Sequence, residues 1–242
     1  MSCYMLIMEG FLDIEVVSLK FDLLNHVPKH WRKPVLLSEF FVLFLCLPIV
    51  LFYVRQDFAP YLILLLVTLV TWCLLLLLSD HRFKRFRLWN IIKLKSYFPT
   101  VLKTFGIAAI VITLASWHFT PDSLFFLPQH QTLMWLGLLV LYPLLSAWPQ
   151  EVIFRTFFFH RYKKVFKDKS LRAILSAIVF ALAHLMFANW IAVVGSFFAG
   201  LVFAFTYMQS RSTLLVAIEH SLWGCWLFTA GLGAHFDSTM LT

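Results

Sequence analysis

The stretch Pro149-Gln150-Glu151-Val152-Ile153-Phe154-Arg155 places a glutamate and an arginine four residues apart inside a long apolar run. A bilayer accepts ionisable side chains only where they face the protein interior and have a partner. Glu151 and Arg155 stand at i and i+4 with the acid first, which favours an ion pair on one face of a helix. Two interpretations stay open at this point: a structural pair that neutralises itself, or part of a functional site.

The composition around this stretch is that of a membrane protein. The 242 residues are 61% hydrophobic and 13% charged, with a mean hydropathy of +0.84. Such a chain is too hydrophobic for a soluble domain and long enough for several membrane spans. The net charge of +8 fits basic cytoplasmic loops, and no basic stripe with interleaved aromatics indicates a nucleic-acid partner. We therefore predict an all-α, polytopic helix bundle in the cell membrane, or in the inner membrane if the source is bacterial.

Apolar runs separated by polar connections predict about seven transmembrane helices. Lys and Arg gather before the first run, between the second and third, and between the fourth and fifth, so the N-terminus is predicted to be cytoplasmic. The residues between the second and third runs, 80–100, are expected to form a polar connection. Pro143 and Pro149 are expected to kink the fourth helix. The predicted spans are 35–54, 61–79, 101–119, 132–160, 171–187, 191–209 and 213–229.

The chain divides into four parts on this interpretation. Residues 1–34 are an N-terminal interfacial segment, because apolar positions are mixed with charges there and a basic run closes it. Residues 35–130 hold the N-terminal transmembrane helices. Residues 131–230 form the helix bundle that carries Glu151 and Arg155, and residues 231–242 are a short tail.

Further polar residues stand in the apolar runs: His184 in the fifth, and Glu219 and His220 in the seventh. At a rise of about 1.5 Å per residue, Glu151 lies about 15 Å from the cytoplasmic end of its helix, His184 about 18 Å and His220 about 14 Å. The sequence therefore predicts that an acid and two imidazoles meet at one depth. A carboxylate beside neutral histidines can hold and deprotonate a water molecule.

The same three side chains are also of the types that bind zinc, with a fourth position left for water. However, the sequence has no H-E-x-x-H motif, and the cationic Arg155 on the face of Glu151 opposes a metal there. No cofactor is therefore predicted, and zinc bound by Glu151, His184 and His220 stays the alternative.

Three motifs resemble those of the CPBP family of intramembrane proteases, which contains the type II CAAX prenyl endopeptidases and bacterial immunity-linked relatives. The family pattern E-E-x-x-x-R corresponds to Gln150–Arg155, F-x-x-x-H to Phe180–His184, and H-x-x-x-N/D to His220–Gly224. The resemblance covers about residues 133–228. It implies hydrolysis of a peptide bond in a membrane-anchored protein or peptide within the lipid bilayer.

The resemblance also implies roles for single residues. In the family a motif-one glutamate and the motif-two histidine activate water, while the motif-three histidine and its Asn stabilise the oxyanion. Here the glutamate that usually activates water is Gln150, and the Asn position is Gly224. Glu151 must then act as the base, alone or with His184. The predicted catalytic residues are Glu151, His184 and His220, and the supporting residues are Gln150, Arg155, Phe180, Glu219 and Gly224.

The role of Glu219 is open, because it could supply a second carboxylate or face another helix, since neighbouring helical residues point about 100° apart. The two departures also leave a second function open, a non-catalytic immunity or scaffold protein that binds a membrane peptide. A proton-coupled transporter is less favoured, because no inverted repeat is seen. Nothing in the loops selects a substrate or shows whether it is prenylated.

Overall fold

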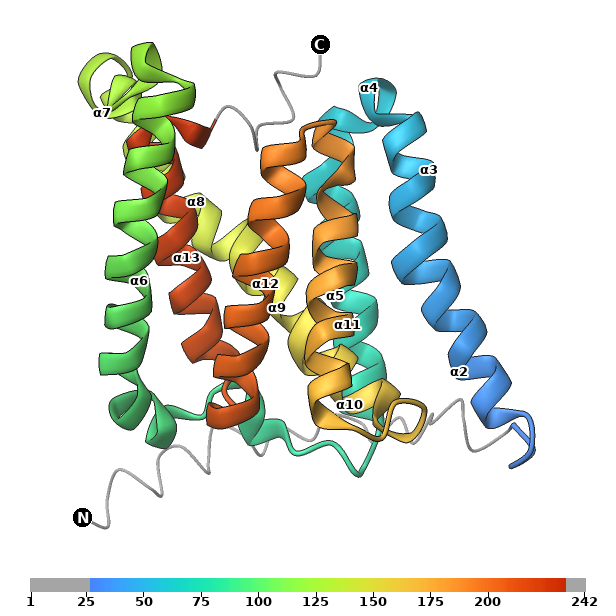
Figure 1. Cartoon of the computed structure of the whole chain (residues 1–242). Coiled ribbons are helices and arrows are strands. Elements are labelled where there is room, and N and C mark those ends of the chain that lie inside the picture. The colour runs from blue at the N-terminus through green and yellow to red at the C-terminus, as the bar shows by residue number, and fades with distance from the viewer. Residues whose placement is uncertain (1–26, 234–242) are drawn as a thin grey trace.

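The computed structural model describes residues 27–233, a bundle of helices that run between two opposite ends (Figure 1). Most of the predicted interfacial segment at 1–34 and most of the predicted tail at 231–242 lie outside the described residues. No strand occurs within residues 27–233.

Within residues 27–233, seven helical stretches are long and apolar enough to cross a membrane, as predicted. The first combines α2 (Arg32–Phe41) and α3 (Leu47–Tyr53) through a π-helical turn, Val42–Cys46. The second follows the short α4 (Arg55–Phe58) and consists of α5 (Leu62–Ser79). The others are α6 (Ile91–Phe119), a fourth segmented span, α11 (Lys169–Ala183) with the turn His184–Phe187, α12 (Trp190–Ser210) and α13 (Thr213–Ala230). The chain is a multi-pass membrane protein.

The third helix is longer than predicted. Part of the segment 80–100, expected as a polar connection, is already helical, because α6 begins at Ile91. Its lysines are exposed, and the Lys93 Nζ atom lies 5.9 Å from the centre of the Tyr97 ring. Long basic side chains can keep their charged groups in water while the helix that carries them continues into apolar surroundings. The lysines therefore did not mark where the helix begins.

The fourth span is one helical stretch in which π-helical turns interrupt the α-helix, the first of them at Pro143, while the kink expected from Pro143 and Pro149 stays a prediction. It runs through α8 (Thr132–Tyr142), a π-helical turn at Pro143–Ala147, α9 (Trp148–Glu151), a second π-helical turn at Val152–Phe157, and α10 (Phe158–Arg161). A proline lacks the N–H of a regular helical turn and crowds the carbonyl four residues earlier. In Figure 1 this yellow segment passes obliquely behind α12 and α11.

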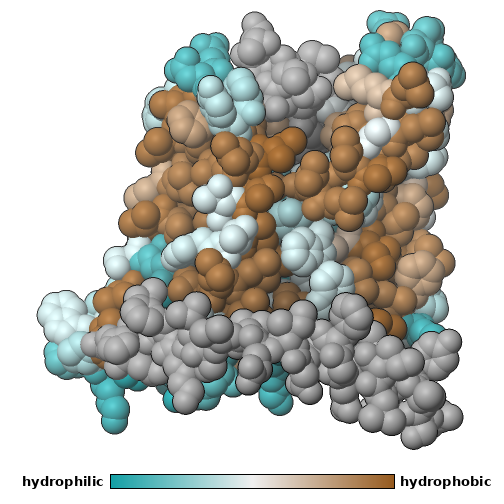
Figure 2. All heavy atoms as spheres, turned by 180° about the vertical axis from the view of Figure 1, so that it is seen from behind, coloured by the Kyte–Doolittle hydropathy of each residue, from teal (hydrophilic) through white to brown (hydrophobic). Residues whose placement is uncertain are grey.

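The outer surface matches a bilayer. Figure 2 shows apolar residues across the middle of one face and hydrophilic residues toward both ends. Exposed apolar side chains on the membrane-spanning helices include Leu64, Ile110, Leu133 and Phe198. Lipid-facing apolar surface of this kind would be unfavourable in water.

Partly buried polar contacts fix the C-terminal end of the fourth span. Glu39 on α2 accepts two hydrogen bonds from Arg161, Nε to Oε1 at 2.9 Å and Nη2 to Oε2 at 2.6 Å. The Tyr162 hydroxyl also donates to Glu39 Oε1 at 3.0 Å. A bidentate arginine–carboxylate pair sets orientation as well as energy. The first span therefore anchors the segment that carries Glu151.

Candidate active site

One face of the fourth span lines a cavity that opens to the outside of the bundle, since lining residues such as Ile63 and Leu141 are exposed. Tyr142, Ser146 and Gln150 follow one another at four-residue spacing and all line this cavity. Gln150 Nε2 donates to Ser146 Oγ at 2.8 Å. Glu151 is the next residue on the helix and is turned into the protein, where it is fully buried.

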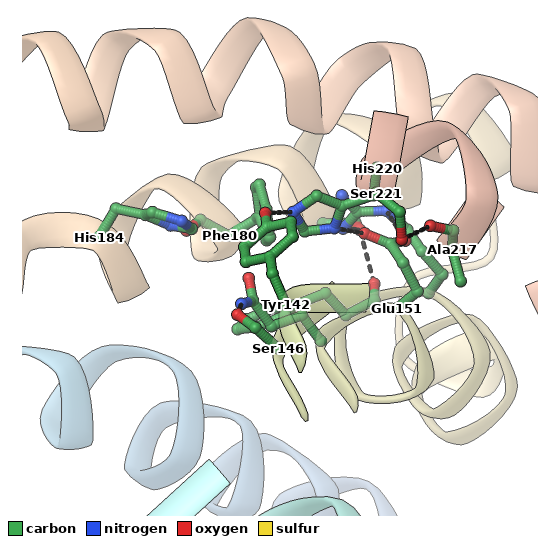
Figure 3. A network of polar contacts seen from close by, with 12 residues as sticks. Tyr142, Ser146, Glu151, Phe180, His184, Ala217, His220 and Ser221 are labelled. Carbon is green, nitrogen blue, oxygen red and sulfur yellow. Dashed lines mark hydrogen bonds and ion pairs between the residues drawn. The ribbon is translucent and has the colours of Figure 1, made fainter. Parts of the chain in front are cut away.

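Both carboxylate oxygens of Glu151 are engaged (Figure 3). His220 Nδ1 donates to Oε1 at 2.8 Å. The Arg155 Nε atom lies 3.2 Å from Oε2. That second contact lacks hydrogen-bond alignment, so it is a contact between charges. The ion pair predicted from the i, i+4 spacing is therefore present, and Glu151 is the buried counter-ion of Arg155.

Aromatic rings hold Arg155 in place. Its guanidinium carbon lies 4.8 Å from the centre of the Phe180 ring and 5.9 Å from that of Phe203. Its Nη1 donates to Ser176 Oγ at 2.9 Å, and Ser176 in turn donates to the Phe154 carbonyl at 2.7 Å. A delocalised guanidinium is suited to such stacked, desolvated surroundings.

His220 links the Glu151–Arg155 ion pair to the cavity wall. A carboxylate can only accept, so Nδ1 carries the proton directed at Glu151 and Nε2 carries the lone pair. The Tyr142 hydroxyl lies 2.9 Å from Nε2 and donates to it. The imidazole also stacks on Phe203, with ring centres 4.8 Å apart. Tyr142, His220 and Glu151 therefore form one chain of hydrogen bonds that runs inward from the cavity.

His184 lies apart from that chain. Phe180 stands between the two histidines, with its ring centre 4.7 Å from His184 and 5.5 Å from His220 (Figure 3). His184 Nδ1 donates to the Phe180 carbonyl at 2.8 Å, so Nε2 carries the lone pair. His184 lines the cavity, whereas Glu151 and His220 do not. The expected cluster of Glu151, His184 and His220 thus divides into a buried Glu151–His220 pair and a separate His184 at the cavity wall.

The remaining predicted residues fall on different sides of the site. Glu219 is fully buried and accepts a hydrogen bond from Thr104 of α6 at 2.6 Å, so it faces another helix and not the cavity. Gly224 is buried against the ring of Tyr142. Phe180 separates the buried pair from His184 and supports Arg155.

The cavity has a volume of about 670 Å³ and a mainly apolar wall. Its apolar side chains come from several spans, among them Leu47, Leu51, Leu66, Leu69, Leu138 and Leu141. Polar groups at its wall include Tyr142, Ser146, Gln150 and His184. An apolar chamber with a few convergent polar groups is typical of a binding site for a hydrophobic ligand.

The donor set does not fit a metal. No group of three or more His, Cys, Asp or Glu side chains in the described part of the chain is arranged to hold a metal ion. The Arg155 guanidinium approaches one oxygen of Glu151, and both nitrogens of His220 have hydrogen-bond partners. We therefore derive no step through zinc.

Sequence reasoning missed Tyr142, Ser176, Phe203 and Thr104. Tyr142 precedes a proline within an apolar span, and a hydroxyl at that depth needs a partner, which is a usable signal. Ser176 and Thr104 also carry hydroxyls within spans, yet such residues often bond only to their own helix. Phe203 gave no signal, because an aromatic residue in a membrane helix is ordinary.

A comparison with protein families supports the resemblance. A family model described as type II CAAX prenyl endopeptidase Rce1-like matches residues 128–226, from before α8 into α13. The resemblance inferred from the three motifs is thereby confirmed for this part of the chain. No match was found among the curated proteins or the solved structures.

Proposed function

We propose that this chain is an intramembrane endopeptidase that hydrolyses a peptide bond in a membrane-anchored protein or peptide. The observation that carries the proposal is the apolar cavity of about 670 Å³ with His184, Gln150 and Tyr142 at its wall. The match to a prenyl endopeptidase family over residues 128–226 supports it. The first two spans supply part of the apolar wall, which suits a substrate segment that is itself buried in lipid.

His184 takes the role of base in this proposal. Glu151 was the first choice from sequence, yet its oxygens are bound to His220 and Arg155 and it does not line the cavity. A neutral imidazole with a lone pair on Nε2 can accept a proton from water. The water oxygen then bonds to the carbonyl carbon. As the C–N bond breaks, the proton passes from Nε2 to the leaving nitrogen.

Gln150 orients rather than deprotonates. Its amide has no basic lone pair, but its oxygen can accept a hydrogen bond from water or from a backbone N–H of the substrate. Its Nε2 already donates to Ser146, which fixes the amide. A single histidine without a carboxylate base predicts a slow enzyme.

Replacing His184 with alanine is expected to abolish cleavage, a loss of about 10² to 10⁴-fold, because the proton acceptor is removed. The purified protein is reconstituted into liposomes with synthetic membrane peptides, with and without a C-terminal isoprenoid, and products are identified by mass spectrometry. His118→Ala, at an exposed histidine, is the matched control. A parallel sample with a chelator tests for a metal requirement. Cleavage by His184→Ala at the wild-type rate contradicts the assignment.

A second candidate function is a non-catalytic protein that binds a membrane peptide, as an immunity or scaffold protein would. Gln150 at the cavity wall and the enclosed Glu151 specifically favour it. In that case the same peptides co-purify with the wild-type protein and with His184→Ala, and no product forms with either.

We also propose that the basic end of the bundle faces the cytoplasm of a cell membrane, following the positive-inside rule. In a cysteine-free background, a membrane-impermeant thiol reagent added outside intact cells is expected to label Asp122→Cys. The reagent is expected to leave Lys167→Cys unlabelled until the cells are opened. Both positions are exposed. Asp122 follows the C-terminus of α6 and Lys167 lies between α10 and α11, and these two connections are at opposite ends of the bundle in Figure 1. The reverse labelling pattern contradicts this orientation.

A further inference from the structure

Gly224 leaves room for the ring of Tyr142. A Cβ atom at position 224 would lie 2.2 Å from Tyr142 Cε1 and 2.4 Å from both Cζ and Oη. Any side chain there would displace the phenol. The phenol thus fills the volume that a residue-224 side chain would take, the position where the motif that this segment resembles has Asn or Asp.

The phenol is also placed to act on the cavity. Tyr142 lines the cavity, and its hydroxyl lies 2.9 Å from His220 Nε2. His220 is fixed from its other side by Glu151 at 2.8 Å. Of the three residues in this hydrogen-bonded chain, Tyr142 borders the cavity, whereas His220 and Glu151 do not. Tyr142 is therefore the residue of the chain that a ligand in the cavity meets.

We propose that Tyr142 is a catalytic residue, the hydrogen-bond donor to the carbonyl oxygen of the scissile peptide, and that Gly224 is required for it. The proposal rests on the endopeptidase function. When water bonds to the carbonyl carbon, the π electron pair of the C=O bond moves onto its oxygen. That oxyanion is a stronger acceptor than neutral imidazole, so the phenol hydrogen turns from Nε2 to the substrate. No proton leaves Tyr142 in this step.

The packing supports a fixed phenol position. The Tyr142 ring meets the His220 ring edge-on at 5.9 Å and the Phe228 ring at 5.4 Å between ring centres. A donor that is already held in place needs little reorganisation when charge develops, which is what makes such donors effective.

The Tyr142→Phe variant tests the hydroxyl alone. It keeps the ring that packs on Gly224 and is expected to lower kcat by about 10² to 10³-fold with little change in KM. The assay uses a quenched fluorescent transmembrane peptide in liposomes, and Tyr53→Phe, at an exposed tyrosine, is the control. If KM instead rises by about 10² to 10³-fold while kcat stays unchanged, the proposal is contradicted.

A reciprocal exchange separates catalysis from packing. Gly224→Asn alone is expected to lose activity, because its side chain collides with the phenol. Tyr142→Ala alone loses the donor. The double variant Tyr142→Ala/Gly224→Asn places an amide donor in the vacated volume and is expected to recover at least about tenfold over Tyr142→Ala. A double variant no better than Tyr142→Ala overturns the role of this position.

The outcomes distinguish the two proposals. Wild-type protein that cleaves none of the peptides contradicts the endopeptidase function, and with it any catalytic role of Tyr142. Wild-type protein that cleaves while Tyr142→Phe cleaves equally well contradicts only the role of Tyr142.

Discussion

Gln150→Glu is expected to raise the rate of peptide cleavage by about 10²-fold or more, because a general base contributes about 10² to 10⁴-fold. The two side chains have nearly the same shape, so the cavity keeps its form. The new carboxylate lies at the cavity wall, where Gln150 now sits, and not in the enclosed position of Glu151. Ser146 Oγ, which now accepts from Gln150, can rotate its hydrogen to donate to the carboxylate.

The assay is the same liposome cleavage measurement, with kcat and KM determined separately. Gln150→Met is the matched control, since it keeps the length of the side chain without an acid. If wild-type protein is inactive and Gln150→Glu cleaves, the natural chain is the non-catalytic binder described as the second candidate. If the rates of Gln150→Glu and wild type are equal, Gln150 does not face the attacking water.

Glu151→Gln is expected to lower the free energy of unfolding by about 3 to 5 kcal/mol, because it leaves the buried Arg155 charge without its counter-ion. Arg155 is fully buried and 3.2 Å from Glu151, so water cannot replace the lost partner. Arg155→Met is expected to lower the free energy of unfolding by a similar amount, because it leaves the buried Glu151 carboxylate without its counter-ion. The double variant removes both charges and is expected to cost far less than the sum of the two single changes.

Unfolding of the four proteins in detergent micelles, followed by helical circular dichroism, completes this cycle. Asp57→Asn, at an exposed acid on α4, is the control and should change stability by less than about 0.5 kcal/mol. Additive single and double variants would show that the pair is not coupled. Because Glu151→Gln affects folding, its activity must be expressed per folded molecule before it says anything about catalysis.

The helical spans could be predicted because the hydropathy and the prolines of a segment influence the structure of that segment itself. The Glu151–Arg155 pair could also be predicted, since residues four apart on a helix must lie on one face. Counting residues from the basic end gave Glu151 and His220 the same depth, and they are in contact at 2.8 Å.

The depth of a residue in the membrane does not determine toward which neighbouring helix its side chain points. His184 had nearly the same predicted depth, but Phe180 separates it from His220. Likewise Gln150 and Glu151 are neighbours in sequence, and only the packing of the other spans shows that Gln150 meets the cavity while Glu151 is enclosed. Tyr142 was missed because its partner, His220, comes from a helix distant in the chain.

The ion pair of the fourth span lies within a single helix, and this affects how the chain is made. A helix that carries Glu151 and Arg155 one turn apart can cancel both charges before any later span has been synthesised. The free-energy barrier to entering hydrocarbon is then lower than for a lone carboxylate that must wait for α13 to deliver His220. We therefore expect insertion of this segment to depend less on assembly of the finished bundle.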